Sequence, residues 1–341
     1  MTTSVAIVIL NYNGEKLLPT FLPSVIRNSE GAKIVVADNG STDSSVKLIR
    51  ESFPAVELIQ FQENQGFCGG YNAAINQVMA DIVVLLNSDV EVTAGWLESP
   101  LSLLESNPTL VAVQPKILSY QNKNQFEYAG AAGGFIDMLG YPFCRGRIFQ
   151  TLEADEGQYN DQCRIFWATG ACLIIRREKF LEAGGFDEDF FAHMEEIDLC
   201  WRLNRMGYSI YYDGRSTVFH LGGGTLSPNN PRKVYFNFRN GLSLLIKNLP
   251  VSGLLSKLPL RIALDYLAAI NFLLQGTPTS AWAVVKAHLH SMGRVRQNIS
   301  KRIQFNSIGY KIYNNLIINK MIIFQYFVLS KKKFSEIRNP K

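Results

Sequence analysis

The first half of the chain alternates short apolar runs with segments of helical periodicity. Residues 5–10 form a continuous apolar run, which is typical of a strand buried on both faces of a sheet. Residues 33–37 and 82–86 repeat this pattern, and residues 14–28 between the first two runs have apolar side chains at helical spacing. This rhythm predicts an α/β fold with a doubly wound, mostly parallel sheet and right-handed crossovers.

Polar residues follow three of the predicted strands at the point where each strand ends. Ligands of doubly wound sheets bind beyond the carboxyl ends of the strands. We therefore expect these polar clusters to bind the ligand. The clusters are Asn11, Tyr12 and Asn13, then Asp38 and Asn39, and then Asn87, Ser88 and Asp89.

The pattern changes twice further along the chain. Residues 121–161 are polar and rich in glycine, and they predict a long excursion over the surface. After residue 248 the chain becomes apolar and helix-rich, with Pro250 and Pro259 as interruptions. We expect a domain of residues 1–248 and a helical C-terminal extension of residues 249–341.

The cysteines and the N-terminal segment indicate in which cellular compartment the protein is expected. The five cysteines are odd in number and form no CxxC pair, which argues against a disulfide framework or a zinc ribbon and favours a reducing environment. The first apolar run has no basic segment before it and is only about six residues long, too short for a signal peptide or a membrane span. A cytoplasmic protein is expected.

Charge divides the chain into two unlike parts. Residues 249–341 contain 14 Lys and Arg but only Asp265 and Glu336 as acids, a net charge of +12, whereas the remainder carries −7. The apolar segment 321–329 is flanked by lysines and suits an amphipathic element at a membrane interface. We expect peripheral attachment to an anionic membrane surface at the inner face of the cell membrane, and no nucleic-acid partner. The alternative is a solvated basic bundle used for dimerisation or solubility.

Two segments have the composition of a nucleotide site. Asp38, at the start of Asp-Asn-Gly-Ser-Thr-Asp, could accept hydrogen bonds from a ribose or a base, although an Asx turn or helix cap explains the same residues. Gly66 lies in Asn-Gln-Gly-Phe-Cys-Gly-Gly, where glycines would let the backbone approach a phosphate or sugar. The spacing matches neither a dinucleotide fingerprint nor a P-loop.

The third strand end suggests a metal. Asp89 follows an apolar strand, and a carboxylate there could hold Mg²⁺ or Mn²⁺, which prefer oxygen ligands and bridge phosphates. A surface turn with a capping aspartate is the alternative. His220, after a later strand, and Arg239, a possible phosphate clamp, are also compatible with structural roles.

An acidic segment is the candidate catalytic region. Glu195, Glu196 and Asp198 open a predicted helix, and Glu195, Asp198 and Arg202 fall on roughly one face of it. Carboxylates beside an apolar wall are candidates for a general base. A solvated helix start favoured by the macrodipole is the alternative, but the aromatic residues crowded around it argue against full solvation.

Taken in order, these segments resemble the family 2 glycosyltransferases of the GT-A fold, in particular the bacterial rhamnosyltransferase-like branch. The resemblance covers residues 4 to about 245. It is carried by the segments 8–13, 36–43, 64–67, 85–89, 170–177, 184–187 and 195–202, together with His220 and Arg239-Asn240.

The resemblance implies a role for each matching residue. Asp38 would contact the donor nucleoside, Asp89 would bind the metal, and His220 would be a second ligand of the metal or the diphosphate. The catalytic acid pair falls on Glu195 and Glu196, with Glu196 as the general base and Glu195 as the alternative. The chain departs from the family pattern where Glu196 replaces the more frequent Asp, and where Asn87-Ser-Asp89 offers one carboxylate instead of two.

The resemblance also implies the reaction. An inverting displacement would move a sugar from a nucleotide-diphosphate donor to a hydroxyl of a lipid-linked or saccharide acceptor, in the synthesis of a cell-surface polysaccharide such as O-antigen or capsule. Two alternatives remain. A nucleotidyltransferase would need a basic Gly-rich loop after the first strand, where Asn11 to Glu15 stand instead. A non-catalytic nucleotide-sugar-binding module would bind donors without turnover.

Overall fold

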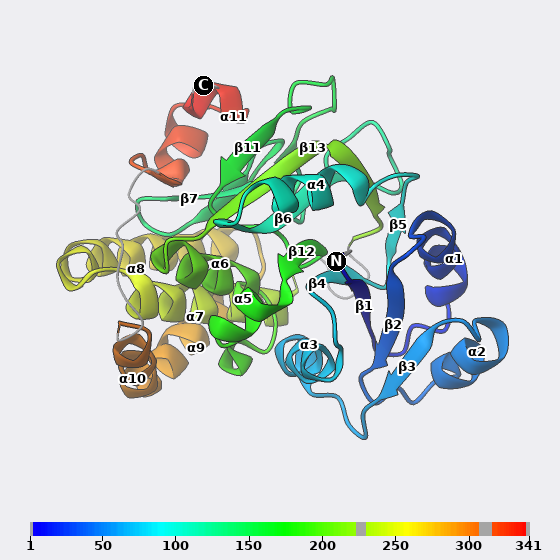
Figure 1. The fold of residues 1–341 in the computed structure, drawn as a ribbon. Coiled ribbons are helices and arrows are strands. Elements are labelled where there is room, and N and C mark those ends of the chain that lie inside the picture. Colours follow the sequence, from blue (N-terminus) through cyan, green and yellow to red (C-terminus); the bar gives the residue numbers. More distant parts are fainter. Residues whose placement is uncertain (1–2, 223–229, 307–315, 339–341) are drawn as a thin grey trace.

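A computed structural model describes residues 3–222, 230–306 and 316–338 of the chain. Its centre is a mixed sheet with the strand order β11-β13-β6-β12-β4-β1-β2-β3, and β5 pairs with β13 (Figure 1). The strands are β1 (Val5–Asn11), β2 (Lys33–Asp38), β3 (Glu57–Gln60), β4 (Ile82–Asn87), β5 (Val90–Val92), β6 (Leu110–Ser119), β11 (Gln162–Ile165), β12 (Cys172–Arg176) and β13 (Ser209–His220).

The predicted α/β fold is confirmed, and its first half is the parallel part of the sheet. β1 pairs in parallel with both β2 and β4, and β2 pairs in parallel with β3. β12 then enters antiparallel between β4 and β6, so the complete sheet is mixed. The helices of this part are α1 (Leu18–Asn28), α2 (Ser45–Ser52), α3 (Gly66–Gln77), α4 (Glu98–Ser106), α5 (Arg177–Glu182) and α6 (Glu195–Arg205).

Both faces of the sheet are buried, which explains the continuous apolar run of the first strand. Ala6 and Val8 belong to the core that includes residues of α3 and α6. Ile7 and Ile9 point the other way, into the core formed with α1 and α4. Successive side chains of a strand face opposite sides, so residues 5–10 of β1 are apolar throughout, and the polar Asn11 stands at its carboxyl end.

Residues 121–161 are not a surface excursion as expected. They form most of a second sheet with the order β10-β9-β8-β7-β14, and many of their side chains are buried. Its strands are β7 (Gly134–Asp137), β8 (Pro142–Cys144), β9 (Arg147–Ile148), β10 (Thr151–Leu152) and β14 (Ile317–Ile318).

The C-terminal region packs against the rest of the chain. α7 packs extensively on α9, and β14 extends the second sheet by pairing in parallel with β7. Phe334 stacks near Phe135 with a ring-centroid distance of 5.1 Å. The helices here are α7 (Pro231–Asn248), α8 (Val251–Leu274), α9 (Pro278–Gly293), α10 (Val295–Asn306), the π-helix η3 (Phe324–Val328) and α11 (Phe334–Ile337).

Two further findings concern the sequence-based expectations. All five cysteines are free thiols. Within the described ranges, no helix has the length and apolar character needed to cross a membrane.

Candidate active site

The strand register aligns the three predicted polar clusters at one edge of the sheet. Asn11 of β1 is the register partner of Asp38 of β2, and Leu10 is the partner of Asn87 of β4. The carboxyl ends of these parallel strands therefore meet at the edge where ligands of such sheets bind.

Asn11 and Asp38 form a buried polar pair at this edge. The Asn11 side-chain amide donates to Asp38 Oδ1 at 2.9 Å, and the Ser41 backbone N–H donates to Asp38 Oδ2 at 3.0 Å. The Asn11 Oδ1 atom is buried and has no hydrogen-bond partner among the described residues. An unsatisfied buried acceptor costs about 1–3 kcal/mol, so this atom is a candidate to receive a ligand donor.

The neighbouring residues of this cluster differ in exposure. Tyr12 is 49% exposed, so its ring is accessible to a base or sugar. Asn13 has a positive φ of 52° and accepts a hydrogen bond from the Thr42 backbone N–H at 2.8 Å, which joins the loop after β1 to the loop after β2.

Asn39 and Gly66 have structural partners. The Asn39 amide donates to the Gly66 carbonyl at 2.9 Å, and its oxygen accepts from the Gln65 N–H at 3.0 Å. A Cβ added at Gly66 would lie 2.9 Å from the Phe191 ring. The close approach expected at this glycine is therefore to Phe191, and Asn39 anchors the loop that makes the approach.

Asp89, His220 and Glu127 form an ion-paired row. His220 Nε2 lies 3.1 Å from Asp89 Oδ1, and Nδ1 lies 3.2 Å from Glu127 Oε2. Burial acts to lower the pKa of His220, but the two carboxylates outweigh it and raise the pKa to about 10. The imidazole is therefore a cation, and it holds the Asp89 pKa below its usual value against the effect of burial. Asn87 borders the row, with Nδ2 3.4 Å from His220 Nε2, and half-buried Ser88 lies in the turn between Asn87 and Asp89.

This row can supply part of a metal site. No group of three or more His, Cys, Asp and Glu side chains in the described part of the chain is arranged to hold a metal ion. Asp89 Oδ1 and His220 Nε2 are 3.1 Å apart, however, which suits adjacent positions of an octahedral ion with bonds of about 2.1 Å. A bound Mg²⁺ or Mn²⁺ would replace the Nε2 proton and would need oxygens from substrate phosphates to complete its coordination.

Glu195 and Glu196 begin α6 in an apolar setting. Burial and the charge of Glu196 raise the Glu195 pKa well above its usual value, and burial raises the Glu196 pKa to about 7. The Oε2 atom of each is buried without a hydrogen-bond partner among the described residues. Glu195 is only 5% exposed, whereas Glu196 is half-buried. Glu196 is therefore the more accessible group, with a pKa suited to a base near neutral pH.

Asp198 does not share this setting, and the prediction that it is catalytic needs correction. It is fully buried, with Oδ2 2.9 Å from both Arg202 Nε and Lys247 Nζ. The Asn248 amide donates to its other oxygen at 2.9 Å. Burial acts to raise the Asp198 pKa, but Lys247 and Arg202 lower it. A fixed, enclosed carboxylate of this kind joins α6 to α7 and cannot reach an acceptor.

Arg239 also differs from its predicted role as a phosphate clamp. Its guanidinium donates to the backbone carbonyls of Asp189 at 2.7 Å and Phe190 at 2.9 Å, and it is only 7% exposed. Its Nη2 is committed to the loop before α6 and its Nε donates to Asn240 Oδ1 at 2.9 Å, so we assign it a structural position.

A series of contacts links the strand-end row to the acidic pair. The Asn87 backbone N–H donates to the Ala171 carbonyl at 3.0 Å, so the start of β12 adjoins the end of β4. The Tyr71 hydroxyl of α3 donates to the Leu86 carbonyl at 3.0 Å. At the start of the same helix, the Phe67 backbone N–H donates to the carbonyl of Phe191, in the loop before α6, at 3.2 Å. α3 therefore contacts both the end of β4 and the loop that leads into the acidic pair.

The model for glycosyl transferase family 2 matches residues 6–183, just over half of the chain. The chain belongs to this family. It is therefore a glycosyltransferase. The N-acetylglucosaminyl-diphospho-decaprenol L-rhamnosyltransferase of Mycobacterium tuberculosis is 28% identical over 237 residues, which cover 64% of this chain and 76% of the relative. The rhamnosyltransferase WbbL of Escherichia coli K12 is 24% identical over 220 residues, covering 61% and 80%.

A solved structure agrees on the fold. The mannosyltransferase PcManGT of Pyrobaculum calidifontis, in complex with GDP-Man and Mn²⁺, matches with a TM-score of 0.53 at 15% identity, over 90% of this chain and 86% of that one. This likeness shows the GT-A fold. Membership of a glycosyltransferase family also removes the nucleotidyltransferase alternative.

Two residues of this family 2 site were missed by sequence reasoning. Glu127, the second carboxylate on His220, lies in the segment taken for a surface excursion, where no local pattern marks it. Lys247, the partner of Asp198, lies in an apolar stretch of α7. A lysine within such a stretch is the sequence signal that could have marked it as a buried, paired residue.

Proposed function

We propose that this family 2 glycosyltransferase transfers a sugar with inversion from a nucleoside-diphosphate donor to an acceptor hydroxyl, with Glu196 as the general base. The observation that carries the proposal is the setting of Glu196. It is a half-buried carboxylate with a pKa raised to about 7 and an oxygen without a hydrogen-bond partner among the described residues. At neutral pH a substantial fraction of such a carboxyl group is ionised, and the ionised form can accept the proton of the acceptor hydroxyl.

The reaction would proceed in one step. Glu196 takes the proton of the acceptor hydroxyl while the acceptor oxygen forms a bond to the anomeric carbon on the face opposite the leaving group. The bond from that carbon to the diphosphate oxygen breaks, and the nucleoside diphosphate leaves with the bonding electrons. Burial and the charge of Glu196 raise the Glu195 pKa well above its usual value, which favours a protonated Glu195 beside an ionised Glu196.

Donor binding is assigned to the edge formed by β1, β2 and β4. Asn11, Asp38 and Tyr12 lie where the nucleoside would bind, and Asp89 with His220 lies where the diphosphate and its Mg²⁺ or Mn²⁺ would bind. The metal supplies positive charge that stabilises the leaving diphosphate. The names of the relatives suggest rhamnose as the donor sugar and a lipid-linked diphospho-sugar as the acceptor. On the family resemblance, we also propose a part in cell-surface polysaccharide synthesis.

The test is a transfer assay with a panel of nucleotide sugars and a polyprenyl-diphospho-sugar acceptor. We expect product from at least one donor with Mn²⁺ and a loss of product with EDTA. NMR of the product should show inverted configuration at the anomeric carbon. Binding of donors without turnover of any of them would contradict the proposal and favour a binding module.

The membrane expectation is also proposed, on the basis of the surface of α8 to α10. This surface exposes many large apolar side chains, while both acids of residues 249–341 are engaged internally. Asp265 is buried against Arg261 and His288, and Glu336 accepts backbone hydrogen bonds from Lys332 and Lys333. The exposed apolar residues include Leu255, Leu267, Ile270, Leu274, Trp282, Leu289, Met292 and Ile303. An apolar surface on a region of net charge +12 (residues 249–341) suits an anionic lipid headgroup layer.

Replacing Leu267 and Leu274 with Glu should release the protein from anionic vesicles. The two side chains are 59% and 82% exposed on α8, so the substitution adds charge without opening the core. Co-sedimentation with phosphatidylglycerol-rich vesicles, compared with neutral phosphatidylcholine vesicles, measures the effect. Met79→Glu, at a 79% exposed position after α3, is the control and should bind as wild type does. Equal binding by the Leu267/Leu274 variant would contradict the assignment, and a change from dimer to monomer on gel filtration would favour the dimerisation alternative.

A further inference from the structure

The loop between Asp187 and Glu195 has an unusual backbone. Phe191, His193 and Met194 have φ values of 64°, 69° and 73°, in the left-handed region that non-glycine residues rarely adopt. Each such residue costs on the order of 1–3 kcal/mol and persists only when its surroundings hold it. Because α6 begins at Glu195, this strained turn sets the position of the catalytic pair.

α7 holds the turn from one side. The Asn240 amide donates to the carbonyls of Ala192 at 2.9 Å and His193 at 2.7 Å, and Arg239 binds the carbonyls just before them. Phe191 stacks on Phe236 with a ring-centroid distance of 5.6 Å. These contacts fix the second half of the loop.

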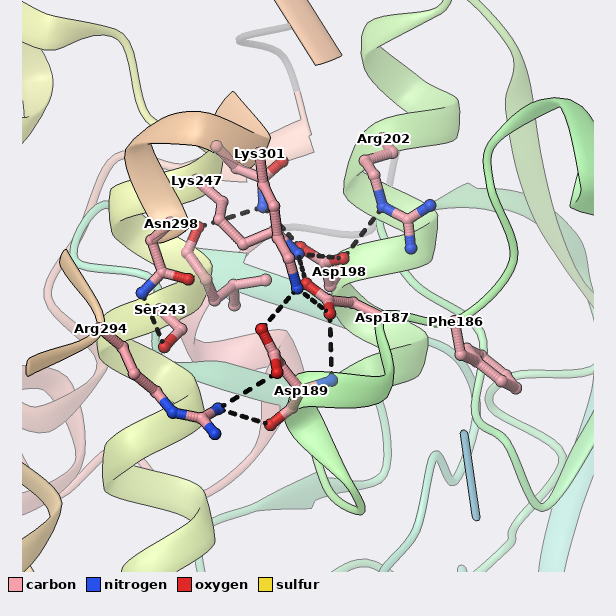
Figure 2. Close-up of polar contacts among 12 residues, drawn as sticks. Phe186, Asp187, Asp189, Asp198, Arg202, Ser243, Lys247, Arg294, Asn298 and Lys301 are labelled. Carbon is pink, nitrogen blue, oxygen red and sulfur yellow. Dashed lines mark hydrogen bonds and ion pairs between the residues drawn. The ribbon is translucent and has the colours of Figure 1, made fainter. Parts of the chain in front are cut away.

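α10 holds the first half through ion pairs (Figure 2). Lys301 Nζ contacts Asp187 Oδ1 and lies 2.6 Å from Asp189 Oδ2. Arg294, at the end of α9, donates to the Asp189 carbonyl at 3.2 Å. α10 itself is fixed on α7, because Asn298 donates to the Ser243 hydroxyl at 3.1 Å.

The ion pairs continue from α10 to the catalytic helix. Asp187 is shared between Lys301 and Lys247, and Lys247 also binds Asp198 of α6. Burial acts to raise the Asp187 pKa, but Lys247 and Lys301 outweigh it and hold the pKa far below its usual value. One network of charges therefore joins α10, the strained loop and α6.

We propose that α10 is a positioning element of the active site, and that Lys301 is its principal residue. By holding Asp187 and Asp189, Lys301 fixes the loop that places Glu196 against the acceptor hydroxyl. The helix lies outside residues 6–183, which the family model matches, so this function would be supplied by the C-terminal region of this chain. The inference rests on the proposed function of Glu196.

Lys301→Met should lower kcat about tenfold, because a small misplacement of a reacting group is costly in rate. The Kd of the donor should stay within about twofold of wild type. The residues assigned to donor binding lie at β1, β2 and β4, and the substitution does not change their contacts with the donor. Lys301→Arg keeps the charge and should restore most of kcat. Arg296→Met, at an exposed position on the same helix, is the matched control and should leave kcat unchanged.

The outcomes separate a positioning role from a purely structural one. A wild-type kcat for folded Lys301→Met, or a loss that Lys301→Arg does not restore, would overturn the proposal. If Lys301→Met does not fold, Asp189→Asn takes its place, because the Asp189 side chain is 39% exposed, and an unchanged kcat there would equally overturn it. Absence of transfer by the unmodified chain would instead contradict the proposed function itself.

Discussion

Glu196→Gln should lower the rate of sugar transfer by about 10²–10⁴-fold, the usual contribution of a positioned general base. Gln has nearly the same size and shape as Glu but cannot accept the acceptor proton. The donor site at the ends of β1, β2 and β4 is untouched, so the donor should bind as before. Single-turnover transfer, together with donor affinity by calorimetry, measures both quantities.

The pH profile provides a second measure of the same residue. Burial raises the Glu196 pKa to about 7, so the base is protonated and inactive below that value. Transfer by the wild type should therefore rise with pH through an apparent pKa near 7. The Gln variant should lose this rise, because the group that titrates has been removed.

Two further variants test whether the loss of transfer is specific to Glu196. Glu182→Gln, on the exposed side of α5, changes a carboxylate paired with Lys179 and should leave transfer unchanged. Glu195→Gln should lower transfer less than Glu196→Gln, since burial and the charge of Glu196 raise the Glu195 pKa and favour its protonated form. The reverse order would move the base to Glu195, and wild-type transfer by Glu196→Gln would remove Glu196 from the role.

The parallel half of the fold could be predicted because its signals are local. The buried strands β1 and β4 are continuous apolar runs, and their spacing leaves room only for crossover helices. The second sheet could not be predicted in this way. Its strands are two to four residues long, and β14 pairs with β7 across about 180 residues of sequence, which no local pattern reveals.

In the candidate site, too, some residues could be predicted from the local sequence and others depend on distant partners. Asp89 follows an apolar strand and is identifiable from that position, whereas only the fold brings it within 3.1 Å of the distant His220. Asp198 was placed among the catalytic acids because helical spacing puts it on the face of Glu195. The spacing could not show that Lys247 and Asn248, on another helix, enclose it.

Asp89→Asn should lower Mn²⁺-dependent transfer by about 10²–10³-fold, since a metal at the leaving diphosphate stabilises the transition state by several kcal/mol. The variant keeps the side-chain shape and leaves His220 paired with Glu127. It should also lose the Mn²⁺ binding that calorimetry detects with a nucleoside diphosphate present. Glu91→Gln, on β5 and paired with Lys123, is the control and should keep both properties. Mn²⁺ binding unchanged by Asp89→Asn would contradict the metal assignment.

The most direct measurement of whether Asp89 and Glu196 serve one site is the anomalous signal of Mn²⁺ in crystals grown with a nucleoside-diphosphate sugar. We predict an ion about 2.1 Å from an Asp89 carboxylate oxygen, bridging the diphosphate, with the anomeric carbon turned toward Glu196. An ion bound elsewhere, or a donor whose sugar points away from the start of α6, would contradict the account.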